Sequence, residues 1–289
     1  IISCLSAIIR SGAKPIFCDV DPQSWNMTLQ NVKDSFSTKT KAVLVVHTYG
    51  LVADIKRISD FCKENSLYLI EDAAEAHGQK IDKQFCGSFG DVSTFSFYAN
   101  KHITTGEGGI LLTDSKNFYE EAKKIRNLDF DNKKRFQHEN LYWNYRLSGL
   151  QAALGNSQIK KLDKTINFKI KQGNYYRYLL SDALDFIELP LEEHNGTLNH
   201  YWVFGILLKK ENIRDKLIEE LLKEGIETRP FFWPLHLQPV IKDISKENKN
   251  LIISEKLGRN GLYLPTGRHI TPKLQKKIVK ILLEKLREI

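Results

Sequence analysis

Alternating apolar and polar stretches predict a strand, a helix and a second strand early in the chain. The runs 42-AVLVVHTYG and 67-LYLIED are strongly apolar, and the first is rich in β-branched residues, as buried strands are. Between them, residues 53–65 carry apolar side chains at helical spacing on one face. This order and spacing are typical of a right-handed βαβ unit in a parallel sheet.

The same pattern predicts further helices and strands, and it indicates a different fold class for the second half of the chain. Further helices are expected at 2–11, 28–36, 115–127, 147–184 with a break near Asp163, 211–224 and 271–288, and further strands at 15–21, 92–98, 109–114 and 201–208. We therefore expect an α/β fold with a mostly parallel central sheet in residues 1–165. A smaller α+β domain should follow in residues 166–289.

Composition and charge narrow the class of protein. The chain has 289 residues, of which 42% are hydrophobic and 27% charged, as in an ordinary globular protein. No apolar run approaches the ~20 residues that would span a bilayer. The net charge is +8, and residues 201–289 hold 18 lysines and arginines against 11 acidic residues. Acidic residues alternate with these bases, so a solvated basic face or an anionic ligand is favoured over nucleic acid.

The four cysteines, at positions 4, 18, 62 and 86, form no Cys-x-x-Cys motif and no cluster with histidine. This spacing predicts no metal site. It favours small buried thiols in a reducing compartment, so we expect a cytoplasmic protein.

Two polar residues at strand ends point to a specific chemistry. Asp72 ends the strand 67–72, and Lys101 follows 29 residues later (101 − 72), after the next predicted strand. Alone, the carboxylate would be a helix cap and the lysine a solvated turn residue. Together they match a pyridoxal phosphate enzyme, which needs an amine for a Schiff base and a carboxylate facing the pyridine nitrogen. The hydroxyl of Ser96 suits the phosphate. No GxGxxG, Walker or GxSxG motif offers a competing chemistry.

Longer motifs carry a resemblance to a known family. The chain resembles the DegT/DnrJ/EryC1/StrS sugar aminotransferases, a branch of the fold-type I pyridoxal phosphate enzymes. The motifs are GAKPIFCDVDPQSWNM, VVHTYG, IEDAAEAHG, GSFGDVSTFSFYANKHITTGEGG, NYRLSGLQAALG, HYWVF and GIETRPFFWPLH. Three of them, EDAAEAHG, KHITTGEGG and GIETRP, are most similar to the GDP-perosamine synthase branch, which aminates C4 of a GDP-4-keto-6-deoxyhexose.

The resemblance implies roles for individual residues. Lys101 would form the Schiff base and then move the proton, and Asp72 would pair with the pyridine nitrogen. Glu75 would bind near the cofactor's 3′-oxygen, and Ser96 would hold the phosphate. Asn144 would reach the phosphate from the neighbouring subunit of a homodimer. Weaker candidates for substrate binding are His77, Arg229 and His236.

The resemblance also leaves alternatives open. The amino donor would be glutamate, and the acceptor a nucleotide-linked keto sugar for polysaccharides such as O-antigen. The acceptor could instead be a UDP- or dTDP-linked 3- or 4-keto sugar, and the chain could be a non-catalytic homologue. A related dehydratase is disfavoured, because those enzymes typically replace the lysine at position 101 with histidine. Family members carry roughly 75–85 residues ahead of the point matching Ile1, so we expect an upstream segment with further phosphate-binding amides.

Overall fold

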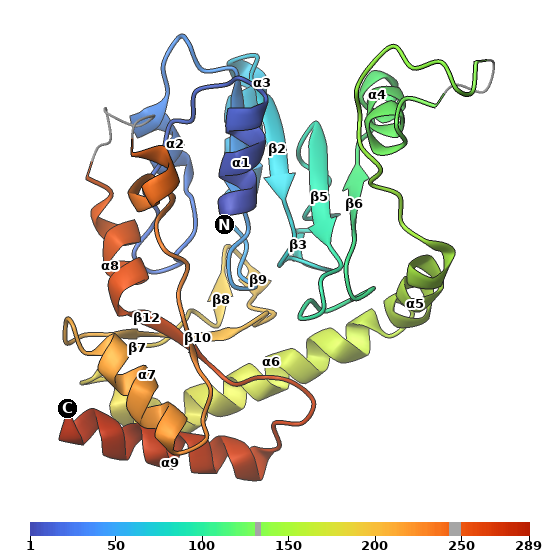
Figure 1. The fold of residues 1–289 in the computed structure, drawn as a ribbon. Coiled ribbons are helices and arrows are strands. Elements are labelled where there is room, and N and C mark those ends of the chain that lie inside the picture. The colour runs from blue at the N-terminus through green and yellow to red at the C-terminus, as the bar shows by residue number, and fades with distance from the viewer. Residues whose placement is uncertain (131–133, 243–249) are drawn as a thin grey trace.

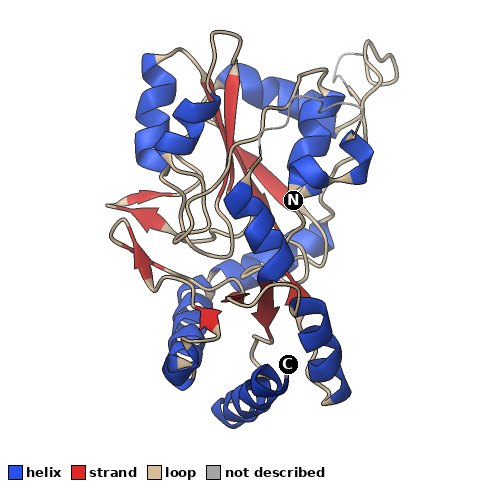
Figure 2. Cartoon of the chain, turned by 90° about the vertical axis from the view of Figure 1, so that its left-hand side faces the viewer, coloured by secondary structure: helices blue, strands red, loops and turns tan. Residues whose placement is uncertain are grey.

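The computed structural model describes residues 1–130, 134–242 and 250–289. Its strands form two larger sheets, one in each half of the chain, and the long helix α6 (Leu162–Leu179) runs across the molecule beneath the first sheet (Figure 1). Figure 2 shows the two units from the side, with the C-terminus in the lower one. No helix in the described ranges has the length and apolar character that crossing a bilayer requires.

The first sheet brings the predicted polar residues to one edge. Its strands are β1 (Ala42–Val46), β2 (Tyr68–Asp72), β5 (Val92–Ser96) and β6 (Gly109–Leu112), in the order β1-β2-β5-β6. The first three are parallel, and β6 runs antiparallel to β5. Because Val46 pairs with Asp72 and Asp72 with Thr94, the carboxyl ends of these strands lie level. Ligands of open α/β sheets bind beyond this edge.

Helices around this sheet follow the predicted pattern closely. They are α1 (Ile2–Arg10), α2 (Leu29–Ser35), α3 (Ile55–Glu64), α4 (Lys116–Arg126) and α5 (Gly149–Ile159). Thr28 and Asn31 form a capping box at the start of α2, which satisfies two backbone donors that a helix leaves free. Helix α3 buries Ile55, Ile58 and Cys62 in the core of the first unit. Its amphipathic pattern therefore determines which face of the helix packs into this core.

The second unit is built on an antiparallel sheet with the order β11-β12-β10-β7. Its strands are β7 (Ile187–Glu188), β10 (Phe204–Leu208), β11 (Arg229–Pro230) and β12 (Gly261–Leu264), and its helices α7 (Arg214–Lys223), α8 (Ile252–Asn260) and α9 (Pro272–Glu288). Short elements complete the chain: hairpins β3 (Lys80–Ile81) with β4 (Gln84–Phe85) and β8 (Glu193–His194) with β9 (Thr197–Leu198), and 3₁₀ turns at Ser181–Ala183, Leu235–Leu237 and Pro239–Ile241. The core of this unit is packed between α6, α7, α9 and β10.

An aromatic cluster joins the two units. Trp25 and Tyr49 from the first half pack with Trp202 and Phe231 from the second. The close approach requires glycine at position 50, where φ is +94° and a Cβ atom would lie 2.5 Å from the backbone nitrogen of Trp202. The backbone segment at Trp202 is thereby held directly against the turn after β1.

Two sequence predictions differ from the structure. Residues 15–21 form no strand; instead Asp19 accepts hydrogen bonds from the backbone N–H groups of Ile253 and Ser254, at the start of α8. Helix α8 and strand β12 were not predicted. The expected helix break occurs at residues 160–161, between α5 and α6. The domain boundary at residue 165, within the first turns of α6, stays a prediction.

Candidate active site

Four of the predicted site residues line one cavity of about 500 Å³ at the carboxyl end of β2. These are Asp72, Glu75, Ser96 and Lys101. Asp72 and Ser96 are the last residues of β2 and β5, and Glu75 and Lys101 lie on the segments that follow these strands. The parallel sheet thus brings together side chains that are up to 29 residues apart in sequence.

Asp72 has a hydrogen-bond donor for each carboxylate oxygen. The thiol of Cys4 donates to Oδ2 over 3.0 Å, and the backbone N–H of Ala74 donates to Oδ1 over 3.1 Å. Burial and the neighbouring Asp72 charge raise the pKa of the Cys4 thiol to about 12, so the thiol remains a donor at neutral pH. These contacts fix the orientation of the carboxylate while leaving it at the wall of the cavity.

Lys101 and Glu75 form a nearly buried ion pair. Nζ of Lys101 lies 3.2 Å from Oε1 of Glu75, and the two side chains are only 9% and 7% exposed. The other carboxylate oxygen accepts the backbone N–H of Tyr49 over 2.8 Å. Burial raises the pKa of Glu75 to about 7, although the positive charge of Lys101 opposes this rise. Glu75 therefore exchanges a proton near neutral pH.

The hydroxyl of Ser96 is oriented by the turn that follows β5. Its Oγ accepts the backbone N–H of Tyr98 over 3.2 Å, which leaves its O–H free to donate to an anion in the cavity. A carboxylate, an amine and a hydroxyl donor within one cavity are the groups that pyridoxal phosphate requires of a protein. The donor set therefore fits this cofactor.

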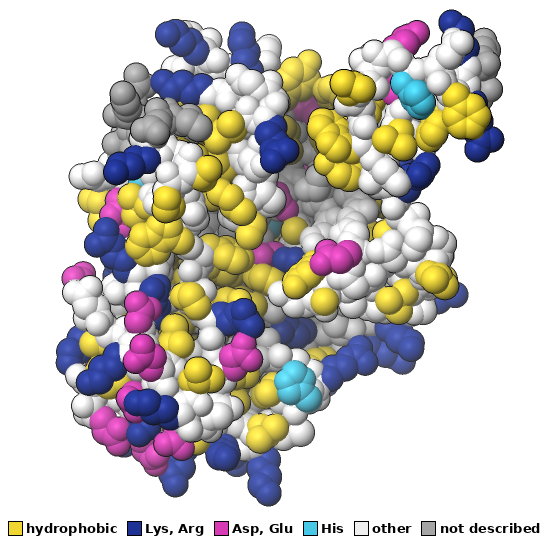
Figure 3. Space-filling view, in the orientation of Figure 1, with side chains coloured by type: hydrophobic (Ala, Val, Ile, Leu, Met, Phe, Trp, Pro, Cys, Tyr) yellow, Lys and Arg dark blue, Asp and Glu magenta, His cyan; other side chains and the backbone are white. Residues whose placement is uncertain are grey.

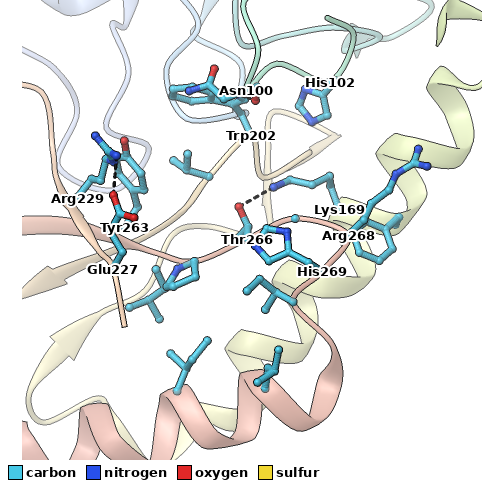
Figure 4. Close-up of a pocket in the computed structure, with 18 of the residues that line it drawn as sticks. Asn100, His102, Lys169, Trp202, Glu227, Arg229, Tyr263, Thr266, Arg268 and His269 are labelled. Carbon is cyan, nitrogen blue, oxygen red and sulfur yellow. Dashed lines mark hydrogen bonds and ion pairs between the residues drawn. The ribbon is translucent and has the colours of Figure 1, made fainter. Parts of the chain in front are cut away.

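A second and larger cavity, of about 1,210 Å³, lies between the two units (Figure 4). It shares Lys101, Asn100 and Trp202 with the first cavity but has neither Asp72 nor Ser96 among its lining residues. We therefore assign the reaction to the smaller cavity.

The walls of the larger cavity are rich in cationic side chains. Lys169 donates to Oγ1 of Thr266 over 2.8 Å, and burial lowers the pKa of this amine to about 7. Arg268 and His269 lie beside this pair in Figure 4, and Arg229 lies on the opposite wall. Arg229 and Arg268 come from the basic last third of the sequence, which also contributes Glu224 and Glu227 to this lining.

The remaining predicted residues lie outside the cofactor cavity. His77 is buried against Phe95 and lines neither of the described cavities. Arg229 lines the larger cavity, where it is exposed and forms an ion pair with Glu227.

His236 and Asn144 are likewise not brought to the cofactor residues within one chain. His236 is buried and directed to Glu255 of α8, with 3.2 Å between Nε2 and Oε1. Asn144 is exposed and forms an isolated bridge with Asn127. Roles for these two residues, as for His77 and Arg229, stay predictions.

The structure adds residues to which the sequence assigned no role. Cys4 and Tyr49 bind Asp72 and Glu75 directly, and the ring of Trp202 lies against Lys101, with 3.7 Å from Nζ to the ring centroid. The motifs VVHTYG and HYWVF contain two of these three residues, but nothing in their spacing indicates which side chain they would meet.

Comparisons with known proteins find relatives in both sequence and fold. A family model described as the DegT/DnrJ/EryC1/StrS aminotransferase family matches residues 2–283. GDP-perosamine synthase of Vibrio cholerae is 37% identical over 270 residues, which cover 92% of this chain and 72% of that protein. The protein of the same name from Escherichia coli O157:H7 is 34% identical over 265 residues, covering 92% and 71%. The crystal structure of the aminotransferase TlmJ from Streptoalloteichus hindustanus superimposes with a TM-score of 0.90 at 27% identity, covering 98% of this chain and 76% of that one.

Proposed function

Since this chain belongs to the DegT/DnrJ/EryC1/StrS aminotransferase family, a family that uses pyridoxal phosphate, we propose that it aminates a GDP-linked sugar. The reaction would move the amino group of glutamate to C4 of a GDP-4-keto-6-deoxyhexose. The observation that carries the proposal is the convergence of Asp72, Glu75, Ser96 and Lys101 on one cavity. The choice of nucleotide and sugar rests on the names of the similar proteins from V. cholerae and E. coli.

Each residue of the cavity has a distinct task in this proposal. Bound pyridoxal phosphate supplies an electron sink for the pair released when a C–H bond breaks. Asp72, whose orientation is fixed by Cys4 and Ala74, would keep the pyridine nitrogen protonated. Ser96 would donate a hydrogen bond to the phosphate. Lys101 is the one lysine among the described residues that line the cavity, so its amine binds the cofactor and carries the proton to and from the substrate carbon.

Glu75 completes this arrangement as the partner of the lysine. Its carboxylate lies 3.2 Å from Nζ of Lys101, within the distance for proton exchange. A pKa of about 7 lets Glu75 hold or release a proton at working pH. We propose that Glu75 also donates to the cofactor's 3′-oxygen when it is protonated.

We further propose that the protein is a homodimer with active sites shared between subunits. The arm, defined here as residues 134–159, carries large apolar side chains that one copy leaves in water. Leu141 is 97% exposed, Leu150 87% and Phe136 79%, and α5 within the arm buries none of its residues. Figure 3 shows apolar side chains gathered on the projecting lobe near α4, beside the hollow at the centre of the molecule. Contiguous exposed apolar surface of this kind is typical of a protein interface.

Asn144 lies within this arm, which supports the expectation that it serves the partner's phosphate site. A twofold dimer would carry each arm to the other subunit, so each site would take Lys101 from one chain and Asn144 from the other. No disulfide joins the four cysteines, all of which lie in the described ranges, and this supports a cytoplasmic location. In the cytoplasm the protein would have access to the sugar precursors used for polysaccharide assembly.

The test is an assay of substrate range. The full-length protein would be incubated with pyridoxal phosphate, glutamate and a panel of GDP-, UDP- and dTDP-linked keto sugars, and the products would be identified by mass spectrometry. We expect a GDP-linked 4-amino sugar and 2-oxoglutarate in equal amounts, and none with Lys101→Ala. Amination of a UDP- or dTDP-linked sugar alone would refute the GDP assignment. Loss of the sugar hydroxyl without amination would refute the aminotransferase reaction.

A further inference from the structure

The indole ring of Trp202 lies against the amine of Lys101, and we infer that Trp202 is the positioning residue of the catalytic lysine. The inference rests on the proposed function, in which Lys101 is the reactive amine. Nζ of Lys101 lies 3.7 Å from the centroid of the Trp202 ring, and Trp202 is only 6% exposed. The face of an aromatic ring attracts an ammonium group, and the attraction grows when both groups are shielded from water.

The ring is held in a fixed position relative to the lysine backbone. Nε1 of Trp202 donates to the carbonyl oxygen of Asn100 over 3.0 Å, and Asn100 directly precedes Lys101. On its other side the indole lies parallel to the ring of Tyr49, with 6.5 Å between centroids and 3° between planes. The indole of Trp202 is thus anchored to the backbone next to Lys101, the residue whose amine it faces.

The backbone that presents Trp202 is held in an unfavourable conformation. Tyr201 has φ +46°, in the left-handed region that bulky residues rarely adopt. Its N–H donates to Oδ1 of Asn199 over 2.8 Å, and the N–H of His200 donates to the carbonyl oxygen of Gly50 over 2.9 Å. Such strain persists only where surrounding contacts impose it, and it is concentrated at functional sites. Here those contacts place the ring at Lys101.

Trp202 and Glu75 together surround the amine with complementary groups. Glu75 faces Nζ at 3.2 Å, and the ionisable side chains of Asp72 and Tyr49 line the same cavity. His77 lies behind this segment, where burial and the charge of Lys101 lower its pKa to about 4. The carboxyl group of Glu75 and the ring face of Trp202 both contact the amine. This pair would hold the free amine of Lys101 at the wall of the smaller cavity.

Trp202 and Lys101 line both cavities. Removal of the ring would therefore free the lysine to turn toward the larger cavity. Trp25 and Trp233, which also line the smaller cavity, would stay in place. We expect the loss of Trp202 to lower kcat much more than it raises KM.

The experiment measures the amine directly, in the full chain and without substrate. Bound cofactor is removed with hydroxylamine, and trace acetic anhydride is added at a series of pH values. Acetylation of Lys101 is then quantified by mass spectrometry, with the exposed Lys56 as internal standard. In Trp202→Leu we expect the pH of half-maximal acetylation at Lys101 to fall by about one unit. Trp202→Phe keeps a ring but loses the Nε1 hydrogen bond, and we expect less than half of that fall.

Two further variants make the test independent of folding and packing. Tetrafluorotryptophan at position 202 keeps the shape and the N–H but weakens the negative ring face, so it should shift the midpoint in the same direction as Trp202→Leu. Trp233→Leu, at another tryptophan of the same cavity, should leave it unchanged. An unshifted midpoint with the folded fluorinated chain overturns the inference, even if Trp202→Leu does not fold.

Kinetics supply a second readout in the holoenzyme. We expect Trp202→Leu to lower kcat about tenfold with less than a twofold change in KM, and Trp202→Phe to restore most of kcat. Equal losses in both aromatic and aliphatic variants would contradict a role for the ring face. Because acetylation needs no sugar, a negative result in the substrate panel would leave this inference standing, and the reverse also holds.

Discussion

The cofactor cavity and the arm differ in where their side chains find partners. In the cavity, each carboxylate oxygen of Asp72 and Glu75 has a donor from the same chain. In the arm, Leu141 and Leu150 are almost fully exposed, and α5 buries no residue. Buried charge is costly without partners, and exposed apolar surface is costly without cover. The contrast supports the proposal that the arm meets a second copy, whereas the hydrogen bonds that orient Asp72 and Glu75 come from within one chain.

Lys101→Ala tests the cavity most severely. We expect it to abolish transamination, because the described walls of the cavity hold no second lysine to bind the cofactor or carry the proton. Truncation removes one partner of a nearly buried ion pair, yet circular dichroism should show an intact fold. Turnover at more than a trace level in this variant would place the reactive amine elsewhere.

Asp72→Asn is expected to have the next largest effect. The amide can still accept the thiol of Cys4, so the cavity should keep its shape and part of its affinity for the cofactor. It cannot hold the pyridinium proton, so we expect kcat to fall by about 10²- to 10³-fold. Near wild-type kcat, with the substitution verified by mass spectrometry, would mean that this carboxylate does not face the ring nitrogen.

Complementation between two variants tests whether the arm of one subunit reaches the cofactor cavity of the other. Lys101→Ala and Asn144→Ala chains would be unfolded together and refolded as a mixture. In a mixed dimer, one site would combine a native Lys101 with a native Asn144 from the other chain. Random pairing should restore about a quarter of wild-type activity, since half of the dimers are mixed and each has one native site. If Asn144 serves its own chain, the mixture should show no more activity than the separate variants.

The arm itself can be tested by a charge at its most exposed residue. Leu141→Arg should cost the isolated fold little but weaken the dimer by more than tenfold, because an interface would have to bury the guanidinium. Leu222→Arg is the matched control, at an exposed leucine of α7 outside the arm. Sedimentation at several concentrations gives both dissociation constants. Equal effects of the two substitutions would remove the arm from the interface.

The sequence predicted the functional residues Asp72 and Lys101 better than it predicted the residues that contact them. Asp72 and Lys101 follow apolar strands, so their placement at one sheet edge depends only on parallel pairing, which the local pattern predicts. Their contacts to Cys4 and Trp202 join residues 68 and 101 positions apart, and no local pattern encodes such distances. Tertiary structure decided these neighbours.

Elements of the fold were missed for a similar reason. Gly258 favours a turn in the sequence, but in α8 its missing side chain makes room for Pro234, where a Cβ atom would lie 2.5 Å from Cδ. Residues 15–21 have the apolar pattern of a strand, yet Asp19 is bound to the first turn of α8 instead. A remote partner determined the local conformation at both places.

The smallest expected effect concerns pH and three histidines behind the cavity, of which His77 and His102 are buried and His200 is half-buried. Burial lowers the pKa of His77 to about 4, of His102 to about 3 and of His200 to about 4. The unfolded chain protonates them near pH 6.5, so the folded state loses stability as pH falls from 6.5 toward 4. Each histidine contributes about 1.4 kcal/mol per pH unit within this window. Glu75 acts in the opposite direction, since its raised pKa of about 7 adds a proton to the folded state.

The free energy of unfolding in urea, measured between pH 5 and pH 6.5, should therefore fall with acidity by less than three histidines alone would give. His102→Gln removes one of them, and we expect its mean slope over this range to be about 1 kcal/mol per pH unit shallower than that of the wild type. His269→Gln, at an exposed histidine, serves as the control and should keep the wild-type slope. A slope unchanged by His102→Gln would mean that this histidine is already protonated in the folded chain. The region behind Lys101 would then be far more hydrated than its burial indicates.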